Sequence, residues 1–212
     1  MLASQVSTHE AFFDRTAATW EATETAEMCG RLARLIRELG VRPGDSVLDV
    51  GCGAGILFPL LALATGGLGL VVAVDLSSEM LRRARNRGFG FPCLHADGGR
   101  LPLRSYAFAW VICNAVFPHF ADKPAALREL GRVLGASGRL IIYHANGREA
   151  INAIHRGIGG AVARDEAPDL DQMAAWRSQA GLTPLVMRDA PDHYLVMAGH
   201  DLASHGDTMD AC

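Results

Sequence analysis

The chain is predicted to fold as one α/β domain with a doubly wound, mostly parallel seven-stranded sheet, closed by an antiparallel C-terminal hairpin. Three observations predict this fold class. Short apolar segments alternate with helical stretches, which is typical of parallel strands joined by crossover helices. A glycine-rich turn directly follows the first apolar segment. Only about half a dozen residues separate the last two apolar segments, whereas a parallel crossover needs roughly a dozen or more, so these two strands must be antiparallel.

The period of the apolar residues predicts the elements of the N-terminal half. In order, helices are expected at 10–20 and 24–39, a strand at 46–50, a helix at about 54–64 and a strand at 70–74. Gly40 ends the second helix, and Pro43–Gly44 forms the turn after it. Pro59 is tolerated near the start of its helix because the first amides of a helix have no acceptor within it. Ser77 is an N-cap residue for a helix after the second strand.

The same alternation continues through the C-terminal half. Strands are expected at 91–95, 107–113 and 138–144, with a helix at about 123–134 before the third of them. A short helix at 148–156 and another near 170–180 precede the hairpin strands at 182–187 and 194–198. Gly181 ends the last helix. The sequence thus predicts five parallel strands and two antiparallel ones.

The composition suits one soluble domain. Half of the 212 residues are hydrophobic, which is enough to build a core. The net charge of -3 gives no electrostatic reason to expect a nucleic acid or an anionic membrane as partner. Five cysteines without a CxxC pair fit a reducing compartment better than a disulfide framework. Residues 1–15 lack a signal-peptide pattern, and the apolar run 56–74 is broken by Pro59 and three glycines, so we expect a cytoplasmic protein without a membrane span.

The turn after the first strand carries Gly51, Gly53 and Gly55 at alternate positions. Glycine permits a tight turn and lets a ligand approach the backbone, and open α/β folds bind ligands at the carboxyl edge of the sheet. The second strand ends in Asp75, an acid placed to accept hydrogen bonds from ribose hydroxyls. The dinucleotide fingerprint G-x-G-x-x-G requires glycine at position 56, where this chain has Ile56. The turn therefore indicates a ribose-bearing ligand other than NAD.

Four segments resemble, in order, the successive motifs of class I S-adenosylmethionine-dependent methyltransferases, in the small group called type 11. They are VLDVGCGAG at 47–55, VVAVDLSSEML at 71–81, HADGGRLPLRSYAFAWVICNAVFPHF at 95–120 and ALRELGRVLGASGRLIIYH at 126–144. The resemblance runs from about residue 12 to residue 198. It implies a Rossmann-like methyltransferase fold, S-adenosylmethionine as cofactor and methyl transfer as activity. It is much less specific for the methyl acceptor.

The resemblance also implies roles for single residues. The cofactor-binding residues that it indicates are Asp49, Gly51, Gly53, Gly55, Asp75, Leu76, Ala96, Asp97, Gly98 and Asn114. In the family, the glycine turn lies under the methionine part of the cofactor, Asp75 would hold the ribose and Asp97 the adenine amino group. Asp49 would orient the turn or reach the cofactor's amino group through water. Asp49 could instead cap a turn, and Asp97 could be an ordinary loop acid.

By the same resemblance, residues 1–200 form a single methyltransferase domain with an N-terminal helical lid at about 8–40. Residues 201–212 are expected to form a disordered tail. Phe13 and Trp20 in the lid are candidate substrate-binding residues. For Trp20, packing in the core of an amphipathic helix is the competing interpretation.

His119 and His144 are candidate catalytic residues, because they follow or end neighbouring strands at the ligand-binding edge. An unperturbed histidine titrates near pH ~6.5, so either could remove an acceptor proton at neutral pH. Arg148 and Asn152, on one helical face with His155, are predicted to bind the acceptor together with His119. A solvated helix face is the alternative. A cluster of His119, His144 and His155 could bind a metal, but no ligand pair has zinc-site spacing, so no metal is predicted.

The sequence therefore predicts an enzyme that transfers the methyl group of S-adenosylmethionine to a small-molecule acceptor by in-line displacement. Two alternatives stay open: an NAD-type dehydrogenase, disfavoured by Ile56 and the closing hairpin, and a non-catalytic S-adenosylmethionine-binding module. No nucleic-acid partner is expected, because segment 114–117 lacks the N-P-P-aromatic type of motif. No membrane partner is expected. The acceptor and the oligomeric state cannot be predicted.

Overall fold

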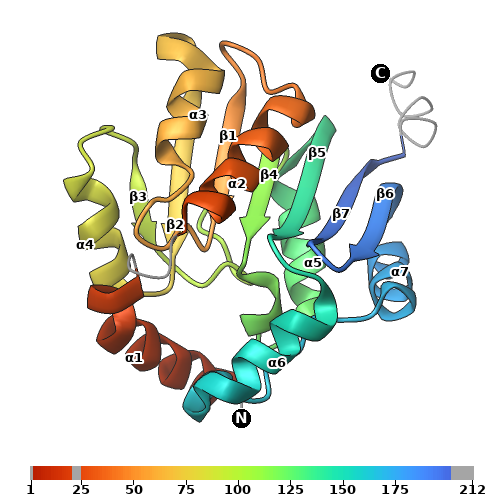
Figure 1. The fold of residues 1–212 in the computed structure, drawn as a ribbon. Coiled ribbons are helices and arrows are strands. Elements are labelled where there is room, and N and C mark those ends of the chain that lie inside the picture. Colours follow the sequence, from red (N-terminus) through yellow and green to blue (C-terminus); the bar gives the residue numbers. More distant parts are fainter. Residues whose placement is uncertain (1, 21–24, 202–212) are drawn as a thin grey trace.

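The structure is a computed structural model that describes residues 2–20 and 25–201. Within these residues, seven strands form one sheet in the order β3-β2-β1-β4-β5-β7-β6 (Figure 1). They are β1 (Ser46–Val50), β2 (Leu70–Asp75), β3 (Cys93–His95), β4 (Phe108–Asn114), β5 (Leu134–His144), β6 (Leu182–Ala190) and β7 (His193–His200). β1 to β5 pair in parallel, and β7 is antiparallel to both β5 and β6. The predicted fold class and the antiparallel hairpin are confirmed.

The helices alternate with these strands. They are α1 (Leu2–Trp20), α2 (Ala26–Leu39), α3 (Phe58–Thr65), α4 (Ser78–Asn86), α5 (Lys123–Val133), α6 (Arg148–Ile158) and α7 (Leu170–Gln179), with short 3-10 helices η2 (Gly66–Leu68), η3 (Phe117–His119) and η4 (Gly160–Val162). Ser77 caps α4 as predicted, because its hydroxyl accepts a hydrogen bond from the Met80 amide. None of the described helices combines the length and the apolar character that crossing a membrane requires.

Three boundaries differ most from the prediction. α3 begins at Phe58 instead of about 54, because the chain from Gly51 through Leu57 forms successive turns around glycines with positive φ. β5 begins at Leu134, directly after α5, and its register against β4 shifts near Phe108. α1 begins at Leu2, well before the predicted start. The predicted tail lies outside the described residues, apart from Asp201.

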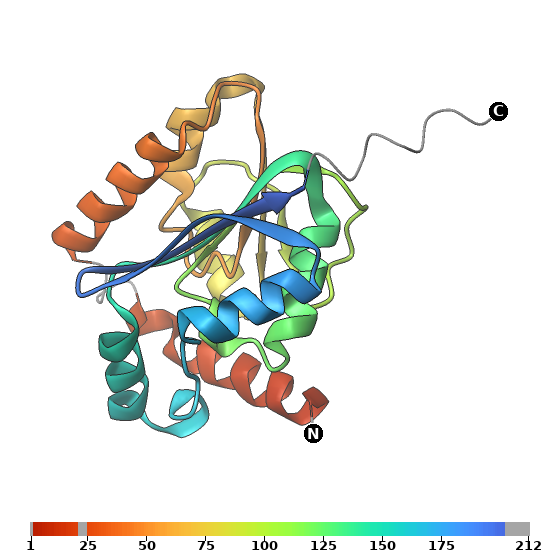
Figure 2. The same cartoon turned by 90° about the vertical axis from the view of Figure 1, so that its right-hand side faces the viewer.

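Helices cover both faces of the sheet (Figures 1 and 2). Side chains alternate across each strand, so Val47 of β1 clusters with Leu32 of α2 and Leu61 of α3. Its neighbour Leu48 belongs to the cluster on the opposite face, with Leu127 of α5. α1 and α6 lie across the carboxyl ends of the parallel strands, at the bottom of Figure 1. The edge at which open α/β folds bind ligands is therefore covered by two helices.

Two leucines of α3 test the packing of this layer. Leu61 is fully buried, whereas Leu63 is 84% exposed. Leu61→Ala is expected to lower the free energy of unfolding by about 2–5 kcal/mol, because it removes buried methyl groups and leaves a cavity. Leu63→Ala should change it by less than about 0.5 kcal/mol. Urea unfolding of both variants is the measurement, and equal losses would contradict the packing of α3 on the sheet.

Candidate active site

The turn after β1 consists of glycines in the left-handed backbone region. Gly51 and Gly53 have φ angles of 68° and 54°, which glycine adopts without steric cost. A Cβ atom on Gly51 would lie 2.3 Å from Cγ2 of Val116, in the segment after β4. At Gly53 no atom lies within 4 Å of the corresponding position. Gly51 therefore permits close packing between two segments, while Gly53 presents bare backbone to open space.

The acid at the end of β2 holds this turn. The Oδ2 atom of Asp75 accepts a hydrogen bond from the Gly53 amide at 2.8 Å, and Oδ1 accepts one from the Ser77 amide at 2.8 Å. Burial raises the pKa of Asp75, and these two hydrogen bonds oppose the rise. Asp75 thus ties the glycine turn to the start of α4.

A pocket opens at the carboxyl ends of β1, β2 and β4, beneath α1. The predicted cofactor residues that line it are Gly51, Gly53, Asp75, Leu76, Ala96, Asp97, Gly98 and Asn114. Three residues predicted for the acceptor, Phe13, Trp20 and His119, line the same pocket. Residues predicted for the cofactor and for the acceptor thus share one cavity.

Two predicted cofactor residues, Asp49 and Gly55, are not in the pocket wall. Both carboxyl oxygens of Asp49 are buried and have no hydrogen-bond partner among the described residues. Burial, together with the charge of Asp75, raises the pKa of Asp49 to about 8. Asp49 is therefore mostly protonated at neutral pH, and it lies on β1 just before the glycine turn.

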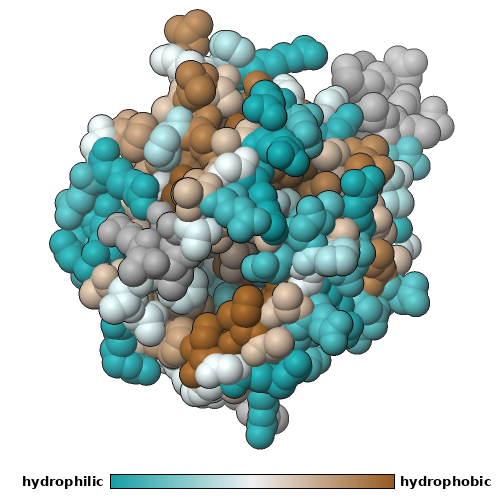
Figure 3. Space-filling model, viewed as in Figure 1, coloured by the Kyte–Doolittle hydropathy of each residue, from teal (hydrophilic) through white to brown (hydrophobic). Residues whose placement is uncertain are grey.

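α1 covers the pocket with aromatic side chains. The ring of Phe13 lies edge-on to Trp20 and to His119, with centroid distances of 5.7 and 5.1 Å. Asp14 fixes the helix to the start of α4, because its Oδ1 accepts hydrogen bonds from the Ser77 hydroxyl at 2.6 Å and the Glu79 amide at 3.1 Å. Figure 3 shows apolar residues on the lower part of the molecule, where Figure 1 places α1 and α6. α2, the other helix of the predicted lid, packs mainly on the sheet.

The polar residues of α6 share one face, as expected, but this face contacts the chain between η4 and α7. Arg148 Nε donates to the Ala167 carbonyl at 3.1 Å, and Asn152 Oδ1 accepts from the Ala167 amide at 2.8 Å. A ring nitrogen of His155 bonds to the Asp165 carbonyl. Arg148 and Asn152 do not line the pocket. They hold the segment that carries Asp165.

His144 is also outside the pocket wall. Its Nε2 atom is buried without a hydrogen-bond partner in the described part of the chain. Burial, with a smaller contribution from the nearby His119 and His155, lowers the pKa of His144 to about 3. Of the two predicted catalytic histidines, therefore, only His119 lines the pocket.

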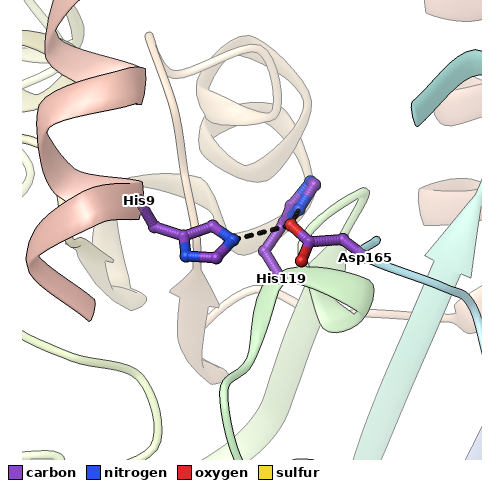
Figure 4. Close-up of side chains that lie close together, drawn as sticks. All are labelled: His9, His119 and Asp165. Carbon is purple, nitrogen blue, oxygen red and sulfur yellow. Dashed lines mark hydrogen bonds and ion pairs between the residues drawn. The ribbon is translucent and has the colours of Figure 1, made fainter. Parts of the chain in front are cut away.

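The partner of His119 is Asp165, which was not predicted from the sequence. Asp165 Oδ2 lies 2.7 Å from His119 Nδ1 and 2.7 Å from Nε2 of His9, on α1 (Figure 4). Asp165 is buried in an irregular segment, 156 residues from His9 along the chain. No spacing pattern connects these positions. The one available signal was that His9 and Phe13 lie four residues apart, on the same face of a helix.

The charges of this cluster differ from one residue to the next. The hydrogen bond to Asp165 raises the pKa of His9, although burial opposes it. Burial lowers the pKa of His119 despite its hydrogen bond to Asp165. Burial would raise the pKa of Asp165, but the hydrogen bonds from His119 and His9 bring it well below its usual value. The cluster thus favours a carboxylate with one protonated and one neutral histidine.

Among the described residues, His9, His119 and Asp165 are also the group whose ligand atoms are close enough to hold a metal ion, since these atoms lie within 4.8 Å of one another. Zinc ligands lie about 2.0–2.2 Å from the ion. Here both histidine nitrogens are at hydrogen-bond distance from one carboxylate oxygen. This arrangement favours a hydrogen-bonded cluster.

The depressed pKa of His144 predicts how stability depends on pH. Below pH 6.5 the unfolded chain binds a proton at this residue, whereas the folded chain does not until about pH 3. Stability is therefore lost as the pH falls from 6.5, by about 1.4 kcal/mol per unit. Relative to His144→Gln, the wild type should therefore lose about 2 kcal/mol of unfolding free energy from pH 7 to pH 5. Urea unfolding at several pH values measures this loss, with His193→Gln as control. If the unfolding free energies of the wild type and His144→Gln changed with pH in parallel, His144 would not be buried in its neutral form.

Comparison with known proteins agrees with this site. A family model described as a methyltransferase domain matches residues 48–142, and the model of protein-L-isoaspartate(D-aspartate) O-methyltransferase matches residues 6–88. A 27-O-demethylrifamycin SV methyltransferase of Amycolatopsis mediterranei is 28% identical over 197 residues, covering 87% of this chain and 70% of the relative. An uncharacterized 37.1 kDa protein in transposon TN4556 of Streptomyces fradiae is 37% identical over 111 residues, covering 51% of this chain. This chain spans about a third (32%) of the length of that protein.

Solved structures show the same fold. The magnesium protoporphyrin IX methyltransferase of Synechocystis PCC 6803, with bound S-adenosylmethionine, superposes with a TM-score of 0.67 at 17% identity. The match covers 93% of this chain and 97% of that one. The glycine turn, Asp75 at the end of β2, Asp97 after β3 and these matches lead to one conclusion. Residues 48–142 match a methyltransferase domain, the fold is that of S-adenosylmethionine-dependent methyltransferases of known structure, and S-adenosylmethionine is the cofactor that these findings support.

Proposed function

We propose that this protein transfers the methyl group of S-adenosylmethionine, by in-line displacement, to a small apolar molecule that carries a protonated nucleophile. One observation carries the proposal. His119 lines the same pocket as the cofactor residues, and Asp165 engages only one of its two ring nitrogens. A base oriented by a carboxylate beside a cofactor site is suited to removing an acceptor proton.

The residues present fit the cofactor. Open space above Gly53 lets a ligand approach the backbone of the turn. Asp75 and Asp97 supply carboxylates in the pocket wall for hydroxyl and amino groups. The unpartnered carboxyl of Asp49 lies behind the turn, where it could reach an amino group through water. When bound, S-adenosylmethionine supplies an electrophilic methyl group whose transfer leaves neutral S-adenosylhomocysteine.

The other residues of the pocket indicate the acceptor class. The pocket that His119 lines has an apolar wall, which includes Phe13, Trp20, Val116 and Phe120. Such a wall favours an apolar or aromatic acceptor over a charged one. The names of similar proteins agree with a small molecule, since they include a demethylrifamycin methyltransferase and a magnesium protoporphyrin IX methyltransferase. Arg148, proposed from the sequence for an anionic acceptor, is engaged with Ala167 and carries no part of this proposal.

His119 would act as the neutral tautomer that donates its Nδ1 proton to Asp165. In this tautomer Nε2 carries no proton and keeps a lone pair, and the hydrogen bond between His119 and Asp165 leaves this atom unused. The acceptor proton moves to Nε2 as the nucleophile's electron pair forms the new bond to carbon, and His119 later releases this proton to water. The lowered pKa of His119 keeps it neutral, and so competent as a base, at neutral pH.

The rival function is a module that binds S-adenosylmethionine without catalysis. Incubation with methyl-labelled cofactor and a pool of small molecules from a cell extract separates the two. The proposal predicts S-adenosylhomocysteine together with a labelled apolar product. Tight cofactor binding with no S-adenosylhomocysteine from any acceptor pool would favour the module instead.

Gly53→Val tests the cofactor site. Its side chain would enter the open space above the turn, so binding of S-adenosylhomocysteine should weaken at least about 100-fold, as a β-branched side chain occupies the ligand's space. Gly88→Val is the matched control, because Gly88 also has positive φ and open space but lies outside the pocket. Calorimetric titration measures both variants. Equal affinities would place the cofactor elsewhere.

His119→Gln tests the base. Glutamine can still donate a hydrogen bond to Asp165 but cannot accept a proton at neutral pH. Turnover is expected to fall by about 10²–10⁴, while S-adenosylhomocysteine affinity stays within about twofold of the wild type. In the wild type, kcat/KM should fall as the pH drops through the lowered pKa of His119, and this acid limb should be absent in the variant. Full turnover in the variant would remove His119 from the mechanism, and His193→Gln controls for loss of a histidine elsewhere.

A further inference from the structure

We propose that His9, on the covering helix α1, is a positioning residue: as an imidazolium it locks Asp165 in the orientation that holds His119 for proton transfer. This inference rests on the proposed role of His119. His9 lines the pocket wall, but it is assigned no contact with the reacting atoms. It acts through Asp165.

The hydrogen bonds of His9 determine its protonation state. Nδ1 lies 2.9 Å from the Gln5 carbonyl oxygen, and Nε2 lies 2.7 Å from Asp165 Oδ2. A carbonyl and a carboxylate oxygen can only accept hydrogen bonds. Both ring nitrogens must therefore donate, and only an imidazolium carries a proton on each. Burial of His9 and Asp165 strengthens this ion pair by excluding water.

The protonated His9 also affects the charge that His119 experiences. Asp165 alone would stabilise an imidazolium at His119 and remove its base form, whereas the paired Asp165 and His9 have no net charge. The other groups around His119 are His155 on α6, with ring centroids 4.8 Å apart, and Phe13 on α1. At longer range, His144 of β5 interacts electrostatically with His119. Lys123 of α5 interacts in the same way with His9 and Asp165, and Glu166 interacts with Lys123.

The placement of these residues links closure of the pocket to orientation of the base. His9 is on the helix that places Phe13 and Trp20 over the pocket. Asp165 is in the segment that α6 holds through His155 and Asn152. The His9–Asp165 bond therefore joins α1 to the segment between η4 and α7. When α1 is docked, Asp165 is fixed against His119.

Histidine NMR of the protein without cofactor or acceptor tests this inference. Spectra of ¹³C,¹⁵N-histidine-labelled wild type should show His9 doubly protonated at pH 7 and His119 neutral with its proton on Nδ1. In His9→Gln, which keeps a donor but loses the charge, the titration midpoint of His119 should rise by about one pH unit or more. His9→Ala should shift it in the same direction. Thr8→Ala, a neighbouring exposed position on α1, should leave it unchanged.

Once an acceptor is known, the acid limb of kcat/KM in His9→Gln should move up by the same amount, giving about tenfold lower activity at a pH below both midpoints and little change at pH 8.5. A uniform loss at every pH, a neutral His9 at pH 7, or an unchanged His119 midpoint would overturn the proposal. So would a stoichiometric metal ion in the purified protein that is lost in His9→Gln. If the midpoint shifts but His119→Gln retains full turnover, the coupling stands and the proposed base fails.

Discussion

The turn after β1 and the segment after β4 approach each other so closely that Gly51 cannot carry a side chain, and the arrangement of the pocket depends on this contact. A Cβ atom on Gly51 would overlap Val116. Val116 leads directly into η3, which ends at His119. Ala115, just before it, has a φ of 55°, an uncommon conformation that often marks functional sites. Close packing at Gly51 therefore brings the proposed base and the glycine turn into the wall of one pocket.

The site is also completed by long-range contacts at its open side. Two of the polar contacts that fix α1 are those of Asp14 with the start of α4 and of His9 with Asp165. Between these points Phe13 packs against His119. The covering helix, the proposed base and the segment after η4 thus depend on one another through buried polar contacts, which are costly to leave unpaired.

Sequence reasoning predicted the parts of this site that depend on local pattern. The glycine turn and the acids after the second and third strands could be placed at one edge, because parallel strands end together. Asp165 could not be found, since it lies in an irregular segment and meets His9 and His119 only through tertiary folding. The polar face of α6 was predicted correctly as a face, but the sequence does not say that it contacts the chain at Ala167. His144 ends a strand, yet it is buried outside the pocket wall.

We expect the cofactor to bind in the pocket between the glycine turn and α1, beside His119. Titration of ¹⁵N-labelled protein with S-adenosylhomocysteine, followed by backbone amide spectra, tests it most directly. Saturable shifts are expected for the amides of Gly51, Gly53, Leu76 and Gly98, with none in the hairpin strands β6 and β7. Shifts confined to other parts of the chain, or no saturable shifts, would contradict it.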